Sequence, residues 1–423
     1  MTGFFVKSIF SALFILSMLV NCNENPFPDG PGETTWGPIT EDVNGILSTI
    51  ENMRVLKLYG SHYEMGYAHG YLLGPEILER QESNLAKEGV LNLYENQVLP
   101  NIQQVHFPQE YHEEIRGQFE GVKARTTNGI VYSAVLGREV DFNDALALNC
   151  LSTFASREMC SSFSAWGRMT QNSEVLTAYN HDCKTSLGYT GNWYIIVRVP
   201  DEGSGAIPTI CAGLAGDMNV HTTMNSKGIT LACQGIDLHN APTSTTDFTP
   251  EGIIFRKLIE YVDADSPLDG IKNILNVLYT VESEALMMSW PNSVSNTHSA
   301  AVEIDGNLSQ NHGYSLRYPD NHNSYIIQTN SFWLRYPLQP CQRYDNIASR
   351  MESISAGNEP PFTIDSAWQL LSEARIGGDF LTEIAVVFEP VKKRMHVAFA
   401  EPGTNAHECN RITLNIEELI RIQ

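Results

Sequence analysis

Cys160 stands in a stretch whose residue types could carry nucleophilic catalysis, EMCSSFSAWGRMTQNSEVLTAYNHD, from Glu158 to Asp182. A cysteine thiolate is a nucleophile that needs a base to take its proton and donors that hold the charge developing on the attacked carbonyl. A cysteine at a chain's N-terminus carries its own base, because its α-amine, with a pKa of about 7.7 to 8.0, can accept the thiol proton. Two interpretations are therefore open: a structural thiol at the start of a strand, or a nucleophile released by cleavage between Met159 and Cys160.

Two polar side chains follow Cys160 on the next expected strand. Asn180 and Asp182 are one pleat apart, so they lie on the same face of that strand. The carboxylate of Asp182 is expected to hydrogen-bond the α-ammonium or the thiol of Cys160 and to orient it, whereas the simpler interpretation is a turn residue at a strand end. Asn180 is expected either to support this site or only to cap a turn.

The elements that must position these residues change in character at Cys160. From about residue 46 to 158 the apolar residues recur every three or four positions, as in EYHEEIRGQFEGVKA, which predicts mostly helix. After Cys160, short apolar or alternating runs bounded by Gly, Asn, Asp or Pro predict strands, with helical stretches between them. Strand runs separated by helical runs in this order predict an α+β sandwich with helices packed outside.

The composition predicts a globular protein that avoids nucleic acid. The chain has 423 residues, of which 42% are apolar, and this is enough to bury a large core. Its formal net charge is −22, spread without an acidic block. Such a field repels phosphate backbones, so a nucleic-acid partner is disfavoured.

The first residues, MTGFFVKSIFSALFILSMLVNC, predict export. Lys7 precedes an apolar run that is too short to span a bilayer comfortably, which is typical of a signal peptide over residues 1–21. The run ends at Cys22 in a pattern similar to the lipobox of bacterial lipoproteins, so we expect a lipid on Cys22, with an ordinary signal-peptidase cut nearby as the alternative. Residues 22–45 are rich in Pro, Gly and acidic residues and predict a tether to a membrane.

Export changes the interpretation of the other cysteines, because thiols can pair in an oxidising compartment. Six cysteines besides those at positions 22 and 160 are available for pairing: Cys150, Cys183, Cys211, Cys233, Cys341 and Cys409. The sequence leaves their pairing open. It contains no CxxC, no His/Cys cluster with zinc spacing and no HExxH around His62 and His69, so we expect no metal site and no cofactor.

Five motifs, in order, resemble those of the self-processing cysteine N-terminal-nucleophile (Ntn) hydrolases. The resemblance is to the isopenicillin N acyltransferase-like group, with more distant kinship to bile-salt hydrolases, acid-ceramidase-like amidases and phospholipase-B-like proteins. The motifs are LYGSHYEMGYAHGYLL, CSSFSAWG with LTAYNHD, GDMNVHTTMNSKGIT, YIIQTNSFW and TEIAVVFEPVKKRMHVAFA. The resemblance implies an Ntn-hydrolase αββα four-layer sandwich as the catalytic domain, residues 160–423. It also implies a helical N-terminal segment, residues 46–159, that is a propeptide or an α chain, and autoprocessing between Met159 and Cys160.

The resemblance also implies roles for three further residues. Asn330, which ends YIIQTN, corresponds to the family's oxyanion donor, while the simpler interpretation is a turn residue closing a strand. Asn225 in MNSKG is expected to shape a turn with Gly228, and a second oxyanion donor is the alternative. Arg343 stands where several relatives carry a substrate-site arginine, with a solvated arginine at a helix start as the alternative. Tyr179 departs from the bile-salt-hydrolase branch, which has arginine there, so the charge around the thiol differs.

Three functions fit this pattern. The first is an exported amidohydrolase or acyltransferase acting on a small N-acyl amide through a Cys160 acyl-enzyme. The second is a phospholipase-B-like or ceramidase-like hydrolase that uses the same cysteine on a lipid-like substrate. The third is a non-catalytic binding lipoprotein on the same fold. We expect the first, because a nucleophile, a carboxylate and amide donors are all present, although the same groups serve amides and esters alike.

Overall fold

The structure is a computed structural model that describes residues 33–151, 159–185, 190–236, 246–281, 283–320, 323–336 and 340–421. The predicted signal peptide, Cys22 and the first part of the predicted tether lie outside these residues. Among the helices in the described ranges, none has both the length and the apolar character needed to cross a membrane.

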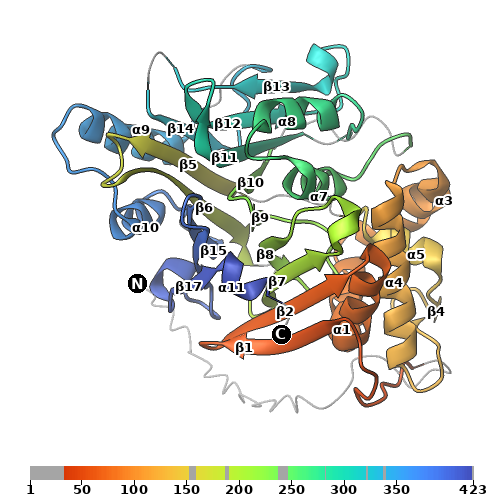
Figure 1. The fold of residues 1–423 in the computed structure, drawn as a ribbon. Coiled ribbons are helices and arrows are strands. Elements are labelled where there is room, and N and C mark those ends of the chain that lie inside the picture. The colour runs from red at the N-terminus through yellow and green to blue at the C-terminus, as the bar shows by residue number, and fades with distance from the viewer. Residues whose placement is uncertain are drawn as a thin grey trace, which may run out of the picture.

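Two large β-sheets form the centre of the described part of the chain (Figure 1). The larger has the strand order β1-β2-β7-β8-β9-β10-β11-β12-β13. The bounds of these strands, in that order, are Gly45–Ile50, Met53–Gly60, Trp193–Pro200, Thr209–Leu214, Thr222–Asn225, Thr230–Gly235, Glu284–Val294, Thr297–Ile304 and Tyr314–Arg317. The pairing of β2 with β7 is parallel, and the other pairings in this sheet are antiparallel.

The smaller sheet carries Cys160 and has the order β14-β5-β6-β15-β16-β17. Its strands are Tyr325–Thr329, Met159–Gly167, Ser173–Lys184, Phe380–Glu389, Arg394–Phe399 and Ile412–Asn415, all paired antiparallel. A separate hairpin is formed by β3, Tyr132–Ser133, and β4, Arg138–Glu139.

The helices lie outside the sheets, at opposite sides of the molecule in Figure 1. They are α1 His62–Leu85, α2 Val90–Leu93, α3 Leu99–Asn101, α4 Gln109–Arg125, α5 Phe142–Leu148, α7 Glu251–Tyr261, α8 Pro267–Leu275, α9 Gln342–Ser355, α10 Ile364–Glu373 and α11 Ile416–Leu419. Short 3₁₀ or π segments lie at Tyr94–Val98, Ile102–Gln104, Glu202–Ser204, Asn311–Gly313 and Ala406–Glu408.

Apolar side chains join these elements into four layers. One buried cluster contains residues of both sheets, among them Ile195 of β7 and Val386 of β15, and so fills the space between the sheets. A second cluster packs α1, α7 and α8 on the outer face of the larger sheet. A third packs α9 and α10 on the outer face of the smaller sheet. This αββα arrangement confirms the predicted fold class.

The start of the N-terminal segment differs from the prediction. Residues 46–60 form most of β1 and the whole of β2 instead of helix, so the helical prediction is wrong there. The reason is that β2 lies between β1 and β7 and is buried on both faces, so its sequence lacks a clear alternation of apolar and polar residues. From His62 onward the segment is mostly helical, as expected. Because β2 pairs with β7, this segment shares a sheet with the predicted catalytic domain.

Helices α1 and α4 touch backbone to backbone through glycines. A Cβ atom at Gly66 or Gly70 of α1 would lie 2.0 Å from a carbonyl oxygen of α4. A Cβ atom at Gly117 or Gly121 of α4 would lie 2.1 Å from a carbonyl oxygen of α1. Real Cβ atoms do not come so close, so only glycine permits this helix pair.

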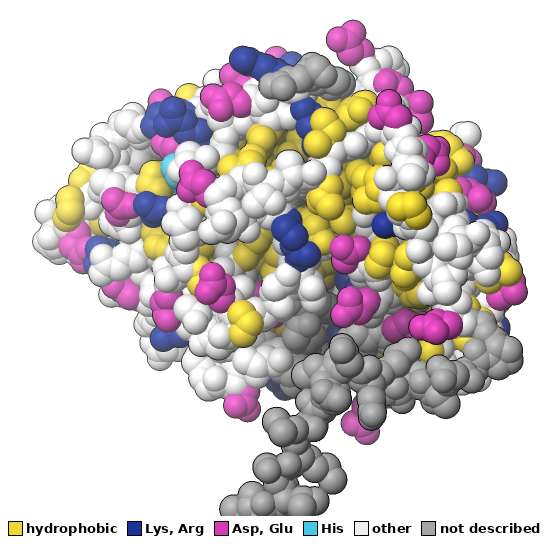
Figure 2. Space-filling view, turned by 90° about the horizontal axis from the view of Figure 1, so that it is seen from below, with side chains coloured by type: hydrophobic (Ala, Val, Ile, Leu, Met, Phe, Trp, Pro, Cys, Tyr) yellow, Lys and Arg dark blue, Asp and Glu magenta, His cyan; other side chains and the backbone are white. Residues whose placement is uncertain are grey.

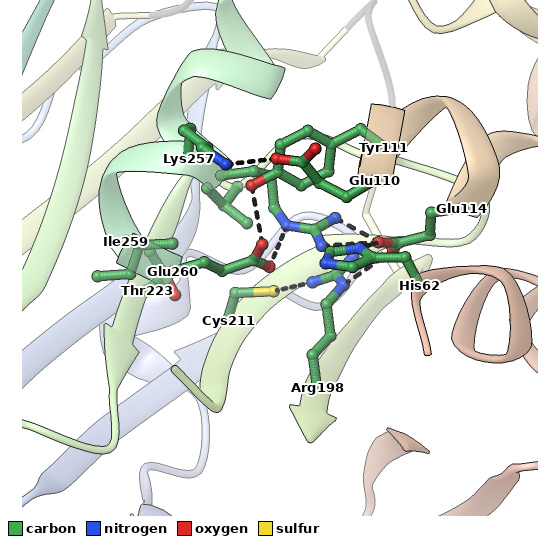
Figure 3. Close-up of polar contacts among 12 residues, drawn as sticks. His62, Glu110, Tyr111, Glu114, Arg198, Cys211, Thr223, Lys257, Ile259 and Glu260 are labelled. Atoms are coloured by element: carbon green, nitrogen blue, oxygen red, sulfur yellow. Dashed lines mark hydrogen bonds and ion pairs between the residues drawn. The ribbon is translucent and has the colours of Figure 1, made fainter. Parts of the chain in front are cut away.

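A buried ion cluster, here called the Glu114 cluster, joins these helices to the larger sheet (Figure 3). Glu114 of α4 accepts a hydrogen bond from Arg256 Nη2 of α7 at 2.9 Å and lies 2.7 Å from His62 Nδ1 of α1. Arg198 Nε of β7 is 3.5 Å from Glu114, and Arg256 Nε donates to Glu260 at 2.6 Å. Burial raises the pKa of Glu114, but Arg256, His62 and Arg198 outweigh it and hold that pKa well below its usual value.

The cysteines do not form a full set of three pairs. Four of the six candidates are free thiols and lie on different elements or loops: Cys150, Cys211, Cys341 and Cys409. A disulfide needs Cα atoms within about 7 Å, and the fold distributes these four among separate apolar clusters and loops. The sequence left the pairing of the six cysteines open, and at least these four are unpaired in this structure.

Charged side chains are mixed on the surface. On the face that Figure 2 shows, Asp and Glu side chains are scattered among Lys and Arg, and apolar side chains gather in a central region. Positive charge is not concentrated on this face.

Candidate active site

The thiol of Cys160 lies between the two sheets. Cys160 is the second residue of β5, is fully buried and stands opposite His181 of β6 in the strand register. Its side chain belongs to a cluster that includes Ala232 of β10 and Met287 of β11, both from the larger sheet. The prediction that Cys160 starts a strand is therefore confirmed, and the side chain points into the interior of the sandwich.

Two side chains of β6 contact the thiol. The Tyr179 hydroxyl donates to Cys160 Sγ at 3.4 Å, and His181 Nδ1 lies 3.7 Å from the same sulfur. The Tyr179 hydroxyl is also 3.2 Å from His181 Nδ1, so the three side chains form a triangle. Neither residue was predicted to act in the site, although Tyr179 was expected to alter the charge around the thiol. The two-residue period of β6 could have indicated them. It places positions 179 and 181 on one face of the strand, and in the register they stand opposite Ser162 and Cys160.

Asp182 lies on the other face of β6, next to the bond before Cys160. It stands opposite Met159 in the register, and its carboxylate accepts hydrogen bonds from Thr382 Oγ1 at 2.6 Å and from the Ile376 backbone N–H at 3.2 Å. Burial raises the pKa of Asp182 to about 6, while the bond from Thr382 and the charge of Arg343 act in the opposite direction. The carboxylate is thus placed beside the predicted cleavage position.

Asn180 shares this outer face with Asp182, as the strand period predicts. Its Nδ2 donates to the Leu371 carbonyl oxygen of α10 at 2.7 Å, and its Oδ1 lies 3.0 Å from His407 Nε2. These contacts tie β6 to α10 and to the 3₁₀ segment that contains His407. Asn180 therefore supports the strand that carries the site.

Arg343 brings a buried positive charge to Cys160 from α9. Its Nη1 donates to the backbone carbonyl oxygen of Cys160, and its Nη2 lies 3.9 Å from Met159 Sδ. Nη2 also donates to Asn330 Oδ1 at 2.7 Å. The alternative of a solvated arginine is therefore wrong, because the side chain is buried in the site.

Asn330 follows β14 and reaches the same site through Arg343. Its Nδ2 donates to the Gly235 carbonyl oxygen at 2.5 Å, so in this structure that amide group is engaged at the end of β10. The position agrees with the predicted site, and the oxyanion role stays a prediction.

Asn225 lies apart from this group. It ends β9, its Oδ1 accepts from the Lys227 and Ile229 backbone N–H groups at 3.0 Å, and its Nδ2 donates to the Ile259 carbonyl oxygen of α7 at 2.9 Å. Gly228 has a φ of +84°, which this turn requires. These contacts assign Asn225 to the turn that the sequence predicted. Because they lead to the helices outside the larger sheet, the structure does not bring Asn225 to Cys160.

Further polar side chains surround His181. Its ring centroid is 5.2 Å from that of His221 and 5.5 Å from that of Trp193. Glu383 also belongs to this group. It lies at a register shift between β15 and β6, and such an irregularity changes the direction in which a side chain points. Its two carboxylate oxygens accept hydrogen bonds from Trp193 Nε1 and Thr190 Oγ1, each at 3.1 Å.

One atom each of His181, Cys183 and Glu383 lies within 4.8 Å of the others, and all three side chains are buried. Imidazole, thiolate and carboxylate are groups that Zn²⁺ accepts. Both oxygens of Glu383 already accept hydrogen bonds from the protein, so we assign no metal ion to this group. The expected absence of a metal or cofactor stays a prediction.

This arrangement provides the groups that an acyl transfer requires, all close to the bond between Met159 and Cys160. The thiol contacts an imidazole and a phenol on the inner face of the sheet. A guanidinium binds the Cys160 carbonyl oxygen, and a carboxylate stands opposite Met159. A nucleophile, a proton acceptor and charge-stabilising donors are thus in place.

No protein-family model matches the chain, and no curated protein matches it. Similar solved structures include an orthologue of N-acylethanolamine-hydrolyzing acid amidase from Caenorhabditis elegans (11% identity, TM-score 0.38, 55% of this chain and 93% of that chain). Another is a mutant of conjugated bile acid hydrolase from Clostridium perfringens (11% identity, TM-score 0.41, 63% of this chain and 95% of that chain). A third is penicillin V acylase from Agrobacterium tumefaciens (13% identity, TM-score 0.34, 57% of this chain and 83% of that chain). At such low identities and TM-scores these likenesses decide neither the family nor the function of this chain.

Proposed function

We propose that the chain is a self-processing cysteine Ntn hydrolase that cleaves or transfers the acyl group of an N-acyl amide. The observation that carries this proposal is the buried Cys160 thiol at the start of β5, with Tyr179, His181 and Arg343 around it. A buried thiol in contact with an imidazole, in a residue whose backbone carbonyl binds a guanidinium, is an arrangement suited to nucleophilic attack rather than to packing alone. The resemblance of five sequence motifs to this family supports the same conclusion.

The proposed mechanism begins with cleavage between Met159 and Cys160, which frees the α-amine of Cys160. The amine then takes the thiol proton, and the thiolate attacks the carbonyl carbon of the substrate amide. The amine leaving group departs with a proton, and the acyl group stays on Sγ as a thioester. Water or a second amine then takes the acyl group and restores the thiol. In this scheme Asp182, opposite Met159, faces the charge of the freed ammonium.

Asn330 and Arg343 are the proposed stabilisers of the charge on the attacked carbonyl. Loss of one donor to such an oxyanion typically costs about 3 kcal/mol in the barrier. For Asn330 to donate to the oxyanion, its Nδ2 must release the Gly235 carbonyl oxygen and bind the substrate oxygen instead. Arg343 donates to Asn330 Oδ1 and so orients the amide. We therefore place the acyl group of the substrate near Gly235 and Arg343.

Substitution of Cys160 tests the proposal. Cys160→Ala should remain one uncut chain without activity on N-acyl p-nitroanilides, because alanine has no atom that attacks a carbonyl. Cys160→Ser should cut slowly and turn over substrate poorly, since a hydroxyl is a much weaker nucleophile than a thiol at neutral pH. Intact mass and amidase rate are the measurements.

Cys409→Ala is the matched control, because this free thiol lies outside the site and donates to the Asn405 carbonyl oxygen. It should mature and turn over substrate as the wild type does. A Cys160→Ala protein that matures and hydrolyses N-acyl amides at the wild-type rate would make Cys160 a structural thiol and end the proposal.

Membrane attachment through a lipid on Cys22 is part of the proposal, supported by the leader sequence alone. Export followed by lipidation at Cys22 would place the enzyme on a membrane surface, with the tether of residues 22–45 between the lipid and the folded part of the chain. Cys22→Ala should then move the protein from the membrane fraction to the soluble fraction. Unchanged partitioning would leave an ordinary signal peptide as the interpretation.

A further inference from the structure

We propose that His181 is the base that removes the Cys160 thiol proton in the uncut chain. The inference rests on the self-processing of the proposed function and assigns to the first cleavage a residue that the sequence motifs do not. The uncut chain needs a separate base because the α-nitrogen of Cys160 is part of a peptide bond before the cut. An amide nitrogen has no basic lone pair, so the amine that serves a free N-terminal cysteine is not yet present.

The strand register places His181 at the thiol. Cys160 and His181 are directly opposite residues of β5 and β6, and the side chains of such a pair lie on the same face of the sheet. The Nδ1 atom of His181 is 3.7 Å from Cys160 Sγ, within hydrogen-bond range for sulfur. Imidazole is the side chain whose ordinary pKa is closest to neutrality, so it can accept a proton and return it.

Tyr179 completes the arrangement as a donor to the sulfur. Its hydroxyl lies 3.4 Å from Sγ and 3.2 Å from His181 Nδ1. Once the proton has moved to the imidazole, the Tyr179 O–H and the new N–H both point toward a negatively charged sulfur. Tyr179 thus stabilises the thiolate as a neutral hydrogen-bond donor. The bile-salt-hydrolase branch has a positively charged arginine at this position.

The other acids and bases nearby are placed for different tasks. Asp182 lies on the opposite face of β6 and accepts from Thr382 and the Ile376 N–H, so it does not face the thiol. The titratable groups near the His181 ring include Cys160, Tyr179, Cys183, Glu383 and His221. Of these, Glu383 accepts from Trp193 and Thr190, and His221 Nε2 lies 3.5 Å from Asp217.

The cleavage begins with transfer of the Met159 acyl group from the Cys160 nitrogen to the Cys160 sulfur. The Cys160 thiol proton passes to His181 Nδ1, and the thiolate attacks the carbonyl carbon of Met159. The bond between that carbon and the Cys160 nitrogen breaks, and the imidazolium gives its proton to the departing amine. A thioester between Met159 and Cys160 Sγ remains, and water hydrolyses it to a Met159 carboxylate and a free thiol. From then on the α-amine of Cys160 is present and takes over as base.

The test follows cleavage of the full chain after cell-free synthesis, with intact mass as the readout. His181→Gln should mature at least about 100-fold more slowly, a typical loss for a missing general base. Its remaining cleavage should rise about tenfold per pH unit, because hydroxide must then take the thiol proton. Tyr179→Phe should slow maturation less, since it removes a donor and leaves the base.

The control is His396→Gln on β16 of the same sheet, where His396 contacts Glu389 and Thr413 instead of the thiol. It should mature at the wild-type rate. A measurement without any variant guards against misfolding: the wild-type rate should rise with pH and then level off, because the imidazole can accept the thiol proton only after it has lost its own. A wild-type rate that still rises tenfold per unit above about pH 8 would overturn the inference.

The outcomes separate this inference from the proposed function. A folded His181→Gln chain that matures as fast as the wild type overturns the role of His181, while the role of Cys160 stands. A folded wild-type chain that stays uncut contradicts both, because the self-processing step is then absent. Thermal unfolding of each variant shows whether it is folded.

Discussion

At the scale of single residues, burial decides how the groups around Cys160 behave. Asp182 is buried and accepts two hydrogen bonds, yet its pKa is raised to about 6, because removal of a carboxylate from water costs more than these bonds return. The folded chain therefore binds the Asp182 proton more tightly than the unfolded chain does. Near neutral pH the group holds a negative charge at a cost in stability, which is typical of a functional site.

Asp182 should make the stability of the fold depend on pH. The unfolded pKa is about 3.9, so the cost is absent below about pH 4, grows between pH 4 and 6 and is complete above pH 6. By linkage it amounts to about 3 kcal/mol. Relative to Asp182→Asn, the wild-type free energy of unfolding should thus fall by about this amount from pH 4 to pH 7, as measured by urea titration. Asp201→Asn, at an exposed loop position, is the control, and equal pH profiles for Asp182→Asn and wild type would refute the prediction.

At the scale of elements, the motif around Gly60 to Gly70 builds a junction and a helix crossing. Gly60 has a φ of +103°, and Ser61 with Glu64 forms a capping box that starts α1. Gly66 and Gly70 then let the backbones of α1 and α4 touch. The contribution of this motif to function is thus indirect, because it holds α1 on the sheet that covers the site.

Gly70→Ala should destabilise the protein although alanine is the better helix former. The helix preference favours alanine by about 1 kcal/mol, whereas the new Cβ atom would lie 2.0 Å from the Gln118 carbonyl oxygen. Overpacking of this kind costs about 1 to 3 kcal/mol and more where backbone must move, so the clash should outweigh the helix preference. Chemical denaturation measures the loss. Gly377→Ala, where no atom lies within 4 Å, should change little, and an equal effect at both sites would contradict this explanation.

At the scale of the whole molecule, the two parts on either side of the predicted cut share one core. β2 pairs with β7, and the Glu114 cluster connects α1 and α4 to α7 and β7. Cleavage between Met159 and Cys160 would therefore leave two chains held by sheet hydrogen bonds and buried ion pairs. We expect them to elute together in gel filtration without denaturant and to separate in urea. Elution of residues 160–423 alone in native buffer would contradict this.

Glu114→Gln tests how much the buried cluster contributes to that association. The change removes the carboxylate beside Arg198 and leaves Arg256 with Glu260 as its remaining carboxylate, and loss of one partner from a buried ion pair costs about 3 to 5 kcal/mol. The free energy of unfolding should fall by this amount. Glu113→Gln, on the same helix but partly exposed, should cost less than about 1 kcal/mol. If the two variants are equally stable, the cluster does not hold the parts together.

The sequence by itself determined the features that depend on a few neighbouring residues. Alternation and turn residues predicted that Cys160 starts a strand, that Asn180 and Asp182 share a face and that Asn225 shapes a turn, and the structure agrees. The grouping of helical and strand runs predicted an α+β sandwich with helices packed outside, and the motif resemblance implied its αββα layers. These predictions succeed because a period or a turn is encoded locally.

Only the tertiary structure decided which side chains meet the thiol. A periodic strand pattern gives the two faces but not which of them looks inward, and a register shift of one residue exchanges them. The observed pairing of Cys160 with His181 turns Tyr179 and His181 toward the sulfur and Asp182 away from it. The Arg343 contact with the Cys160 carbonyl spans 183 positions, and β2 pairs with β7, a strand far from it in the sequence. Such contacts arise from packing between distant segments, which no local pattern encodes.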